Sequence, residues 1–367
     1  MADIRPLGPA WEHPLSRERA LALVEAEPAL VAELPRPARA PRGCGLYALT
    51  SAARPVPACG EGEVRLEESV CALGAFDGVH LGHRALVAAA VAEARELGVP
   101  AVAVTFDPDP SVVLSGPRPG DELLCVADRL RLLASLGVDA LLVVPFTSEL
   151  AAHDHASFLS GWLRACVGAV SLHVGRDFRM GRGGAGTVSA LSEAARPLGM
   201  GVHGHELVEV DGSPVSATRI RGLVRGGEVE AAARLLARPH AVRGRVVHGR
   251  GEGTGFGFPT ANVTLGPEAC LPGEGVYAAF AISGGHAWPA AVNVGAPRTF
   301  GGEEGAAFLE ATLLGFDGDL YGDELSVCFV AWLREPRKFA SFDELKATVL
   351  GNVEWVRRFV GEGRVGA

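Results

Sequence analysis

Two histidines in the segment GAFDGVHLGH, residues 74–83, form the first group of side chains suited to chemistry. His80 and His83 lie where an apolar run ends and a helical pattern begins, so the free N–H groups and the dipole of the helix start favour an anion there. Gly82 between them lets a phosphate approach the backbone. Donors grouped in this way suit the stabilisation of charge on an α-phosphate during nucleotidyl transfer. The alternative is a glycine turn with a helix-capping histidine.

A second segment, GRGEGTGFGFPTAN at residues 249–262, combines a glycine-rich loop with two oxygen-bearing side chains. Its glycines bury no side chains, so close approach of the backbone to a ligand is the simplest explanation. Thr260 and Asn262 are two residues apart, which puts both on one face of a strand. Their oxygens suit Mg²⁺ shared with the phosphates of ATP. For the glycines alone, a hairpin without a ligand is the alternative.

The composition of the whole chain excludes several classes of protein. Its 367 residues suffice for two domains, each with its own core. The net charge of −9 argues against general nucleic-acid binding, which needs a basic surface. No apolar run approaches the ~18 residues of a membrane span, and the N-terminus lacks the pattern of a secretion signal. The seven cysteines include no CxxC pair, which favours a reducing compartment. We therefore expect a cytoplasmic protein without a membrane or nucleic-acid partner.

The elements that must position these side chains change in kind near Pro239. Before it, strands alternate with helices, which predicts βαβ units and a parallel sheet. The expected strands cover residues 69–73, 101–106, 140–145, 169–175 and 202–210, with helices at 83–97 and 127–136 and two more ending near Leu236. Beyond Pro239, strand-like runs without helices between them predict an antiparallel barrel, followed by a helix at residues 343–360. Residues 1–66 are rich in Pro, Ala and Arg; a packed domain is not expected there, and nothing in them assigns a role.

Four motifs occur in order along the first part of the chain: GAFDGVHLGH, TFDPDP at residues 105–110, VGRDFRMGRGGAG at 174–186 and VSATRIR at 215–221. Together they resemble the adenylyltransferase module of prokaryotic bifunctional riboflavin kinase/FAD synthetases. The glycine-rich loop with PTAN, followed by VNVG at 292–295 and FDGDLYG at 316–322, resembles the riboflavin kinase module of the same family.

The resemblance implies a division of the chain into three parts. These are an N-terminal extension of unknown role at residues 1–66, a Rossmann-like α/β nucleotidyltransferase domain at 67–236, and a kinase domain at 237–367. The kinase domain is expected to be an antiparallel six-stranded β-barrel with a C-terminal helix. Such an enzyme phosphorylates riboflavin to FMN with ATP and then adenylylates FMN to FAD with ATP, releasing pyrophosphate. Riboflavin, FMN and ATP are thus the expected partners, and Mg²⁺ the expected metal.

The resemblance also implies a role for each matched residue. Glu310 is the general base of the kinase, while His80 and His83 contact the ATP phosphates of the adenylyltransferase. The sequence supports Glu310, because an ionisable side chain in the apolar run 306–316 is costly unless it faces a polar site; a solvent-facing position is the alternative. The other implied positions are Gly74, Phe76, Gly82, Ser216, Thr218 and Arg221 for ATP phosphates in the adenylyltransferase, Asp109 and Asp177 for its flavin and nucleotide pocket, and Gly249, Gly255, Gly257, Thr260 and Asn262 for ATP in the kinase, the last two also as metal ligands.

Several positions depart from the pattern of the family: Asp109, Met180 and Ala217 in the first module, and Glu252, Thr254, Thr312 and Asn352 in the second. Asp109 replaces a histidine, and an ionised carboxylate can only accept hydrogen bonds. We expect it to repel a nearby phosphate unless it pairs with an arginine or holds Mg²⁺. Three interpretations therefore stay open: the bifunctional enzyme, a riboflavin kinase with a weakened or repurposed adenylyltransferase module, and a non-catalytic flavin-binding regulatory protein.

Overall fold

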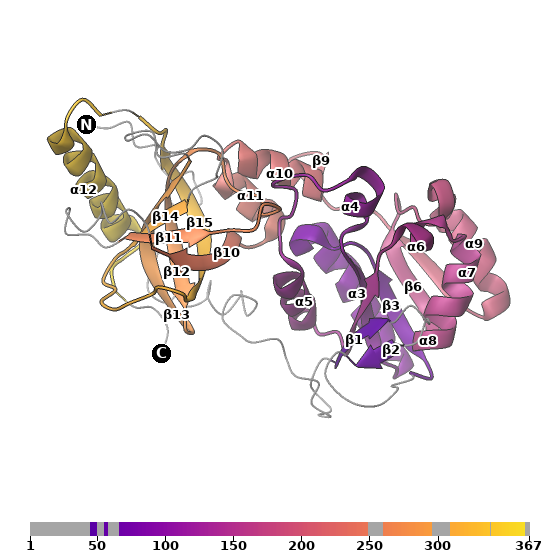
Figure 1. Cartoon of the computed structure of the whole chain (residues 1–367). Helices are drawn as coiled ribbons and strands as arrows, with labels where there is room; N and C mark the ends of the chain where they lie inside the picture. Colours follow the sequence, from indigo (N-terminus) through magenta and orange to yellow (C-terminus); the bar gives the residue numbers. More distant parts are fainter. Residues whose placement is uncertain are drawn as a thin grey trace. The chain divides into compact units, whose positions relative to one another are not determined.

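The chain forms two compact units (Figure 1). The computed structural model describes residues 45–49, 55–57, 66–248, 260–295, 309–337 and 339–363. Among these, the sheet unit comprises residues 45–118 and Val126–Ser216, and the barrel unit comprises Pro119–Cys125 and the residues from Ala217 onward.

The sheet unit is built on a seven-stranded sheet with the order β2-β1-β5-β4-β3-β6-β7. All neighbouring strands are parallel except β1 and β2, which are antiparallel. The strands are β1 (Gly45–Leu49), β2 (Pro55–Pro57), β3 (Ser69–Leu73), β4 (Ala101–Asp107), β5 (Ala140–Pro145), β6 (Ala169–Gly175) and β7 (Gly201–His205), and a separate hairpin is formed by β8 (Glu209–Val210) and β9 (Ser213–Pro214). The interior strand β3 is buried along its whole length, as its continuous apolar run predicts for a parallel sheet covered on both faces.

Helices fill the connections between these strands, as the alternating pattern predicts. The long helix α3 packs on β3, β4 and β6, and α5 packs on β5. The helices of this unit are α3 (Leu81–Leu97), α4 (Pro110–Ser115), α5 (Val126–Ser135), α6 (Ser148–Ala152), α7 (His155–Ser157), α8 (Ala165–Val167) and α9 (Val188–Ala195), with short 3₁₀ turns η2 (Asp77–Val79), η4 (Arg182–Gly184) and η5 (Arg196–Leu198) and a π-helical stretch η3 (Phe158–Arg164).

Two details of the sheet differ from the sequence-based expectation. No packed domain was expected in residues 1–66, yet β1 pairs in parallel with β5 and so extends the sheet. The strand expected over residues 202–210 ends at His205 and is followed by the β8–β9 hairpin. That hairpin turns at Asp211 and Gly212, both with positive φ (55° and 71°), so the chain reverses instead of continuing as one strand.

The barrel unit contains a closed barrel with the order β10-β11-β14-β13-β12-β15. Its six strands are β10 (His240–Val247), β11 (Thr260–Thr264), β12 (Gly275–Ser283), β13 (His286–Val294), β14 (Leu309–Leu313) and β15 (Glu324–Arg334). Apolar side chains such as Ala261, Leu309 and Phe329 form one core cluster, and a second cluster includes Ala291 of β13 with Val353 and Val356 of the C-terminal helix α12 (Phe342–Phe359). Because neighbouring residues of a strand point to opposite faces, we take the first cluster as the barrel interior and the second as the outer face under α12.

Two further helices, α10 (Ala217–Arg225) and α11 (Val229–Leu236), belong to the barrel unit. Helix α11 packs on β10 and β15, with Val229 fully buried in the barrel core. The segment Pro119–Cys125 also joins this unit, because its backbone pairs with residues 267–270 and Asp121 forms an ion pair with Arg225 (2.6 Å). None of the helices in the described part of the chain combines the length and apolar character needed to cross a membrane.

Candidate active sites

The turn between β3 and α3 has an uncommon backbone conformation and carries a buried aromatic ring. Phe76 and Val79 have positive φ (56° and 40°), which non-glycine residues rarely adopt. The Phe76 ring is fully buried and meets the His83 ring edge-on at 5.2 Å between centroids. A Cβ on Gly74 would lie 3.2 Å from this ring, so Gly74 makes room for Phe76. Backbone strain of this kind concentrates at functional sites.

The two predicted histidines lie directly against each other. The rings of His80 and His83 stack at 3.6 Å between centroids, and the His83 backbone N–H donates to Nδ1 of His80 (3.4 Å) at the start of α3. A Cβ on Gly82 would lie 3.2 Å from the His80 ring, which explains the glycine between them. His80 is therefore the N-cap of α3, as the alternative interpretation predicts. It also lies at a helix N-terminus, where an anion is favoured.

Burial sets the charge of His83. Desolvation, with smaller contributions from His80 and Arg129, holds the pKa of His83 well below its ordinary value. The ring is therefore neutral near pH 7, and its buried Nδ1 finds no hydrogen-bond partner among the described residues. A neutral imidazole that carries its proton on the other nitrogen can donate one hydrogen bond to a phosphate oxygen.

Arg129 of α5, which was not among the predicted site residues, positions this turn. Its buried guanidinium donates to the backbone oxygens of Ala75 (2.9 Å) and Phe106 (2.8 Å), and the Thr105 hydroxyl donates to Ala75 O as well (3.0 Å). The only sequence signal was an arginine among the leucines of an apolar helix face. Arg129 joins the ends of β3 and β4 at the carboxyl edge of the sheet, where ligands bind in open α/β sheets.

The other predicted adenylyltransferase residues lie on several different elements. Asp109 is the N-cap of α4, where its carboxylate accepts from the backbone N–H (2.9 Å) and the hydroxyl (2.7 Å) of Ser111. Asp177 is exposed in the turn after β6, and Ser216 is half-buried at the end of the sheet unit. Thr218 and Arg221 lie on α10 of the barrel unit, where Arg221 donates to Thr218 Oγ1 (3.4 Å) and to the carbonyl of Asp121 (3.2 Å).

In the barrel unit, the strand register brings three predicted residues together. Asn262 of β11 lies directly opposite Glu310 of β14, and Thr260 lies opposite Thr312. The Thr260 hydroxyl donates to a Glu310 carboxylate oxygen at 2.6 Å. The candidate base and both candidate metal ligands therefore share one patch of adjacent strands.

Asn293 of β13 completes this row, because it pairs with Glu310 from the other side. It was not among the predicted site residues, although a polar side chain inside the apolar run VNV was a signal. Residues paired across antiparallel strands point to the same face. Since Ala261, Leu309 and Ala311 belong to the interior core, the row Asn262–Glu310–Asn293 points outward.

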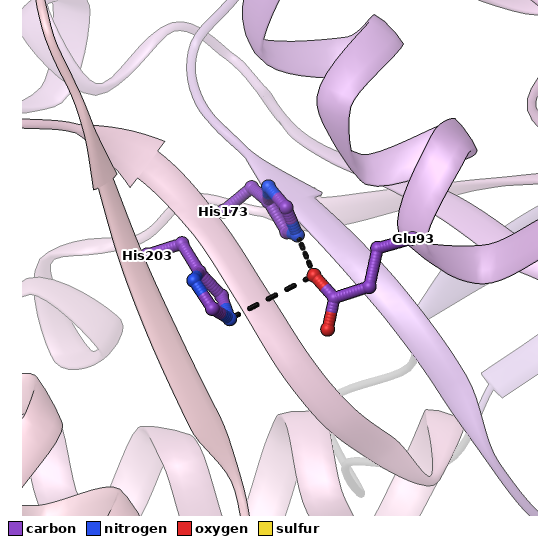
Figure 2. Close-up of side chains that lie close together, drawn as sticks. All are labelled: Glu93, His173 and His203. Carbon is purple, nitrogen blue, oxygen red and sulfur yellow. Dashed lines mark hydrogen bonds and ion pairs between the residues drawn. The ribbon is translucent and has the colours of Figure 1, made fainter. Parts of the chain in front are cut away.

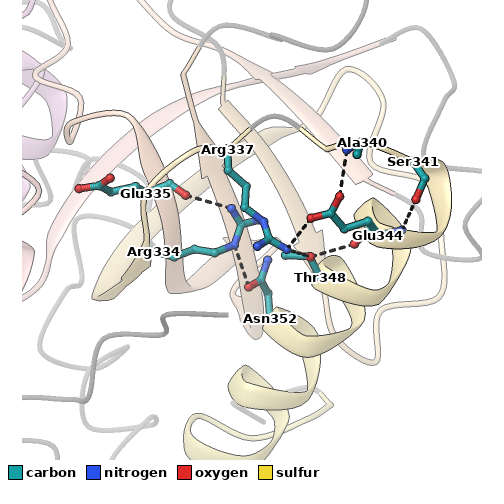
Figure 3. A network of polar contacts seen from close by, with 8 residues as sticks. All are labelled: Arg334, Glu335, Arg337, Ala340, Ser341, Glu344, Thr348 and Asn352. Carbon is teal, nitrogen blue, oxygen red and sulfur yellow. Dashed lines mark hydrogen bonds and ion pairs between the residues drawn. The ribbon is translucent and has the colours of Figure 1, made fainter. Parts of the chain in front are cut away.

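A polar network links the end of β15 to α12 on the outside of the barrel (Figure 3). Arg334 donates from Nε to Asn352 (3.3 Å), and Arg337 donates to the Thr348 hydroxyl (2.5 Å) and lies 3.6 Å from the Glu344 carboxylate. Burial, with a smaller contribution from Arg337, lowers the pKa of Arg334 to about 10, so it stays charged at pH 7. Asn352, one of the departures, is thus a partner of this buried cation.

Gly249, Gly255 and Gly257, with the rest of residues 249–259, lie outside the described residues, as do Phe308 and residues 296–307. Their predicted role at the ATP phosphates stays a prediction.

Both parts of the chain match known protein families. Residues 63–219 match the family model described as FAD synthetase, and residues 236–360 match the one described as riboflavin kinase. A bifunctional riboflavin kinase/FMN adenylyltransferase of Pseudomonas fluorescens is 37% identical over 78% of this chain and 92% of its own length. The protein of the same description from Escherichia coli K12 is 35% identical over 80% of this chain and 94% of its own.

A solved structure is similar to this chain over about the same share of its length. The crystal structure described as that of a macrolide-efflux protein from Streptococcus pneumoniae superposes with a TM-score of 0.71 at 31% identity, covering 80% of this chain and 98% of that one. The order of the two matched models and the near-complete coverage of the relatives agree with the α/β unit followed by the six-stranded barrel. The chain therefore belongs to the family of bifunctional riboflavin kinase/FMN adenylyltransferases.

Proposed function

We propose that this chain phosphorylates riboflavin to FMN with ATP and adenylylates FMN to FAD with a second ATP, and that the two groups of residues described above carry these reactions. The kinase is assigned to residues 237–367 and the adenylyltransferase to residues 67–236. The observation that carries the proposal is the row Asn262–Glu310–Asn293 with the Thr260–Glu310 hydrogen bond, because it holds a carboxylate among amide and hydroxyl side chains of adjacent strands.

In the kinase reaction, the Glu310 carboxylate takes the proton of the ribityl 5′-hydroxyl as that oxygen attacks the γ-phosphorus of ATP. Thr260 holds the carboxylate in place by donating its hydroxyl proton to it. The bond from the γ-phosphorus to the bridging oxygen breaks, ADP leaves, and FMN is formed.

The donor set around Glu310 fits a magnesium ion. Thr260 keeps lone pairs on its hydroxyl oxygen while it donates to Glu310, and Asn262 offers an amide oxygen from the same face of β11. Oxygen ligands are those that Mg²⁺ prefers. When bound there with ATP, Mg²⁺ would neutralise charge on the phosphates.

In the adenylyltransferase reaction, a phosphate oxygen of FMN attacks the α-phosphorus of ATP and pyrophosphate leaves. His80, His83 and the backbone N–H groups at the start of α3 are donors for the charge that develops on the α-phosphate. Arg129 keeps the turn that carries them in its conformation through Ala75. We assign Ser216, Thr218 and Arg221 to the ATP phosphates from the matched motif, and Asp177 to the flavin pocket.

The test of the kinase assignment is Glu310→Gln, which keeps the size and polarity of the side chain but removes the base. FMN formation from riboflavin should fall by about 10²- to 10⁴-fold, while FAD formation from supplied FMN stays near the wild-type rate. Thr260→Ser should retain most kinase activity and Thr260→Val should not, because only serine keeps the hydroxyl that holds Glu310. Full kinase activity in Glu310→Gln would reject this base, and equal loss of both reactions would point to misfolding.

A further inference from the structure

A further group of chemically capable side chains lies in the sheet unit, separate from the nucleotide-binding turn. Glu93 of α3, His173 of β6 and His203 of β7 point toward one another (Figure 2). His173 Nε2 lies 2.5 Å from Glu93 Oε2, and His203 Nε2 lies 3.7 Å from the same oxygen. One nitrogen or oxygen atom from each of the three residues lies within 4.8 Å of the others.

The fold explains why these three side chains lie close together. His173 and His203 are partners in the parallel register of β6 and β7, so both rings stand on the same face of the sheet. Helix α3 packs on β6 from that face and brings Glu93 over the two rings. Glu93 follows His83 by ten residues, about 15 Å along the helix, so this cluster is separate from the nucleotide-binding turn.

We propose that Glu93, His173 and His203 form a site for a divalent transition metal ion of the Zn²⁺ class. Two imidazole nitrogens and one carboxylate oxygen are a ligand set that Zn²⁺ takes, with a water molecule in the fourth position. His203 is half-exposed, which gives that water access. The ion would tie α3 to β6 and to the edge strand β7.

A fourth residue supplies the support that metal-bound histidines need. His205 Nε2 lies 2.8 Å from His173 Nδ1. A ligating histidine commonly donates its other ring N–H to an acceptor, which fixes its tautomer and orientation. When His173 donates from Nδ1 to His205, its Nε2 lone pair is directed at the site.

Binding requires only small movements. Two ligands of a tetrahedral zinc ion are about 3.3 Å apart, so the Glu93–His173 contact must open slightly and His203 must approach. The ion would replace the hydrogen bond between Glu93 and His173. His203 can adjust, because it lies on the last strand of the sheet.

The experiment uses the purified full-length chain, freed of any affinity tag and treated with a chelator. Zn²⁺ alone, without nucleotide or flavin, is added by equilibrium dialysis, and the affinity is measured by competition with a chromophoric chelator. We expect one tightly bound zinc per chain and a rise in the melting temperature. His203→Ala and Glu93→Gln should abolish the tight binding, and His205→Ala should weaken it by about 10- to 100-fold.

Two control variants make the result specific. His153→Ala removes an exposed histidine at the end of α6, and His83→Ala removes one from the nucleotide-binding turn; both should bind zinc like the wild type. Circular dichroism of the metal-free variants checks that they fold. Absence of tight zinc binding in the wild type, unchanged binding in folded His203→Ala and Glu93→Gln, or loss of binding in His83→Ala alone would overturn the proposal.

Discussion

Residue types and spacing alone suggested that Thr260 and Asn262 hold Mg²⁺ beside the phosphates of ATP, whereas the role of Glu310 as a base was implied by the family resemblance. The structure adds that the Thr260 hydroxyl donates to the Glu310 carboxylate. The sequence could not predict that Asn293 lies opposite Glu310, because the register of β13 on β14 depends on pairing across a long connection. Arg129 was missed for a similar reason, since its acceptors are backbone carbonyls of other elements.

Asp109 caps a helix, a role that was not among those expected for it. We expected its charge to repel a phosphate unless an arginine or Mg²⁺ compensated, but its carboxylate caps α4 through Ser111. The N–H and the hydroxyl of Ser111 both donate to one carboxylate oxygen, so this oxygen is directed at the start of α4.

Asp109→Asn tests this directly, because asparagine keeps an N-cap oxygen and removes the charge. We expect FAD formation from FMN to stay within a few-fold of the wild type and the stability to change little. Asp109→Ala should instead lose about 1 kcal/mol of unfolding free energy. A large gain in kcat/KM for FAD formation in Asp109→Asn would instead support repulsion of the phosphate by Asp109.

At the scale of elements, β10 begins with a buried ionisable group whose protonation opposes folding. His240 is fully buried, and its Nε2 donates to the carbonyl of Cys270 (2.7 Å), while its buried Nδ1 has no hydrogen-bond partner among the described residues. A proton added to Nδ1 would therefore be buried without an acceptor. Burial, opposed in part by the Cys270 hydrogen bond, lowers the pKa of His240 to about 4.

The sign of the pH dependence follows from this lowered pKa. Above the ordinary histidine pKa of about 6.5 both states are neutral, so His240 contributes no pH dependence. Between pH 6.5 and 4 the unfolded chain binds a proton that the folded chain does not bind. The free energy of unfolding therefore falls as the pH is lowered through this range. From pH 7 to 4.5 the wild type should lose about 2–3 kcal/mol more unfolding free energy than His240→Gln. Denaturant titrations measure this, with exposed His153→Gln as the control; parallel pH profiles for wild type and His240→Gln would contradict it.

The strands and helices themselves were largely predictable where the local pattern was strong. Apolar runs bounded by turn residues gave β3, β4, β5 and β6 to within a residue or two, and the change of period near Pro239 gave the barrel. Strand β1 was not predicted, because its short run among prolines has no local signal. It becomes a strand through its pairing with β5, some ninety residues further along the chain.

At the scale of the whole molecule, the barrel unit includes more than the predicted kinase domain. Helix α11 ends at Leu236, yet its Val229 is buried in the barrel core and its Glu230 accepts from the backbone N–H of Trp332 (3.3 Å). A chain cut between residues 236 and 237 therefore loses the contacts by which α11 stabilises the barrel. All the kinase motifs nevertheless lie beyond this boundary.

Two fragments test this division. Residues 217–367 and residues 237–367 should both make FMN from riboflavin and no FAD, because neither contains His80 and His83. The longer fragment should be more stable by about 2–3 kcal/mol for the burial of Val229 alone, measured by urea unfolding. A folded longer fragment without kinase activity would contradict the assignment of the kinase to this part of the chain, and equal stability would contradict the role of α11.

The central claim, that one chain makes both FMN and FAD, is tested by one time course. The purified full-length protein is incubated with riboflavin, ATP and Mg²⁺, and the flavins are separated by chromatography. FMN should appear first and FAD later, each formed in amounts limited by the ATP supplied, and FMN given in place of riboflavin should yield FAD without delay. Failure to form FMN from riboflavin, or failure to form FAD when FMN is supplied directly, would contradict the account.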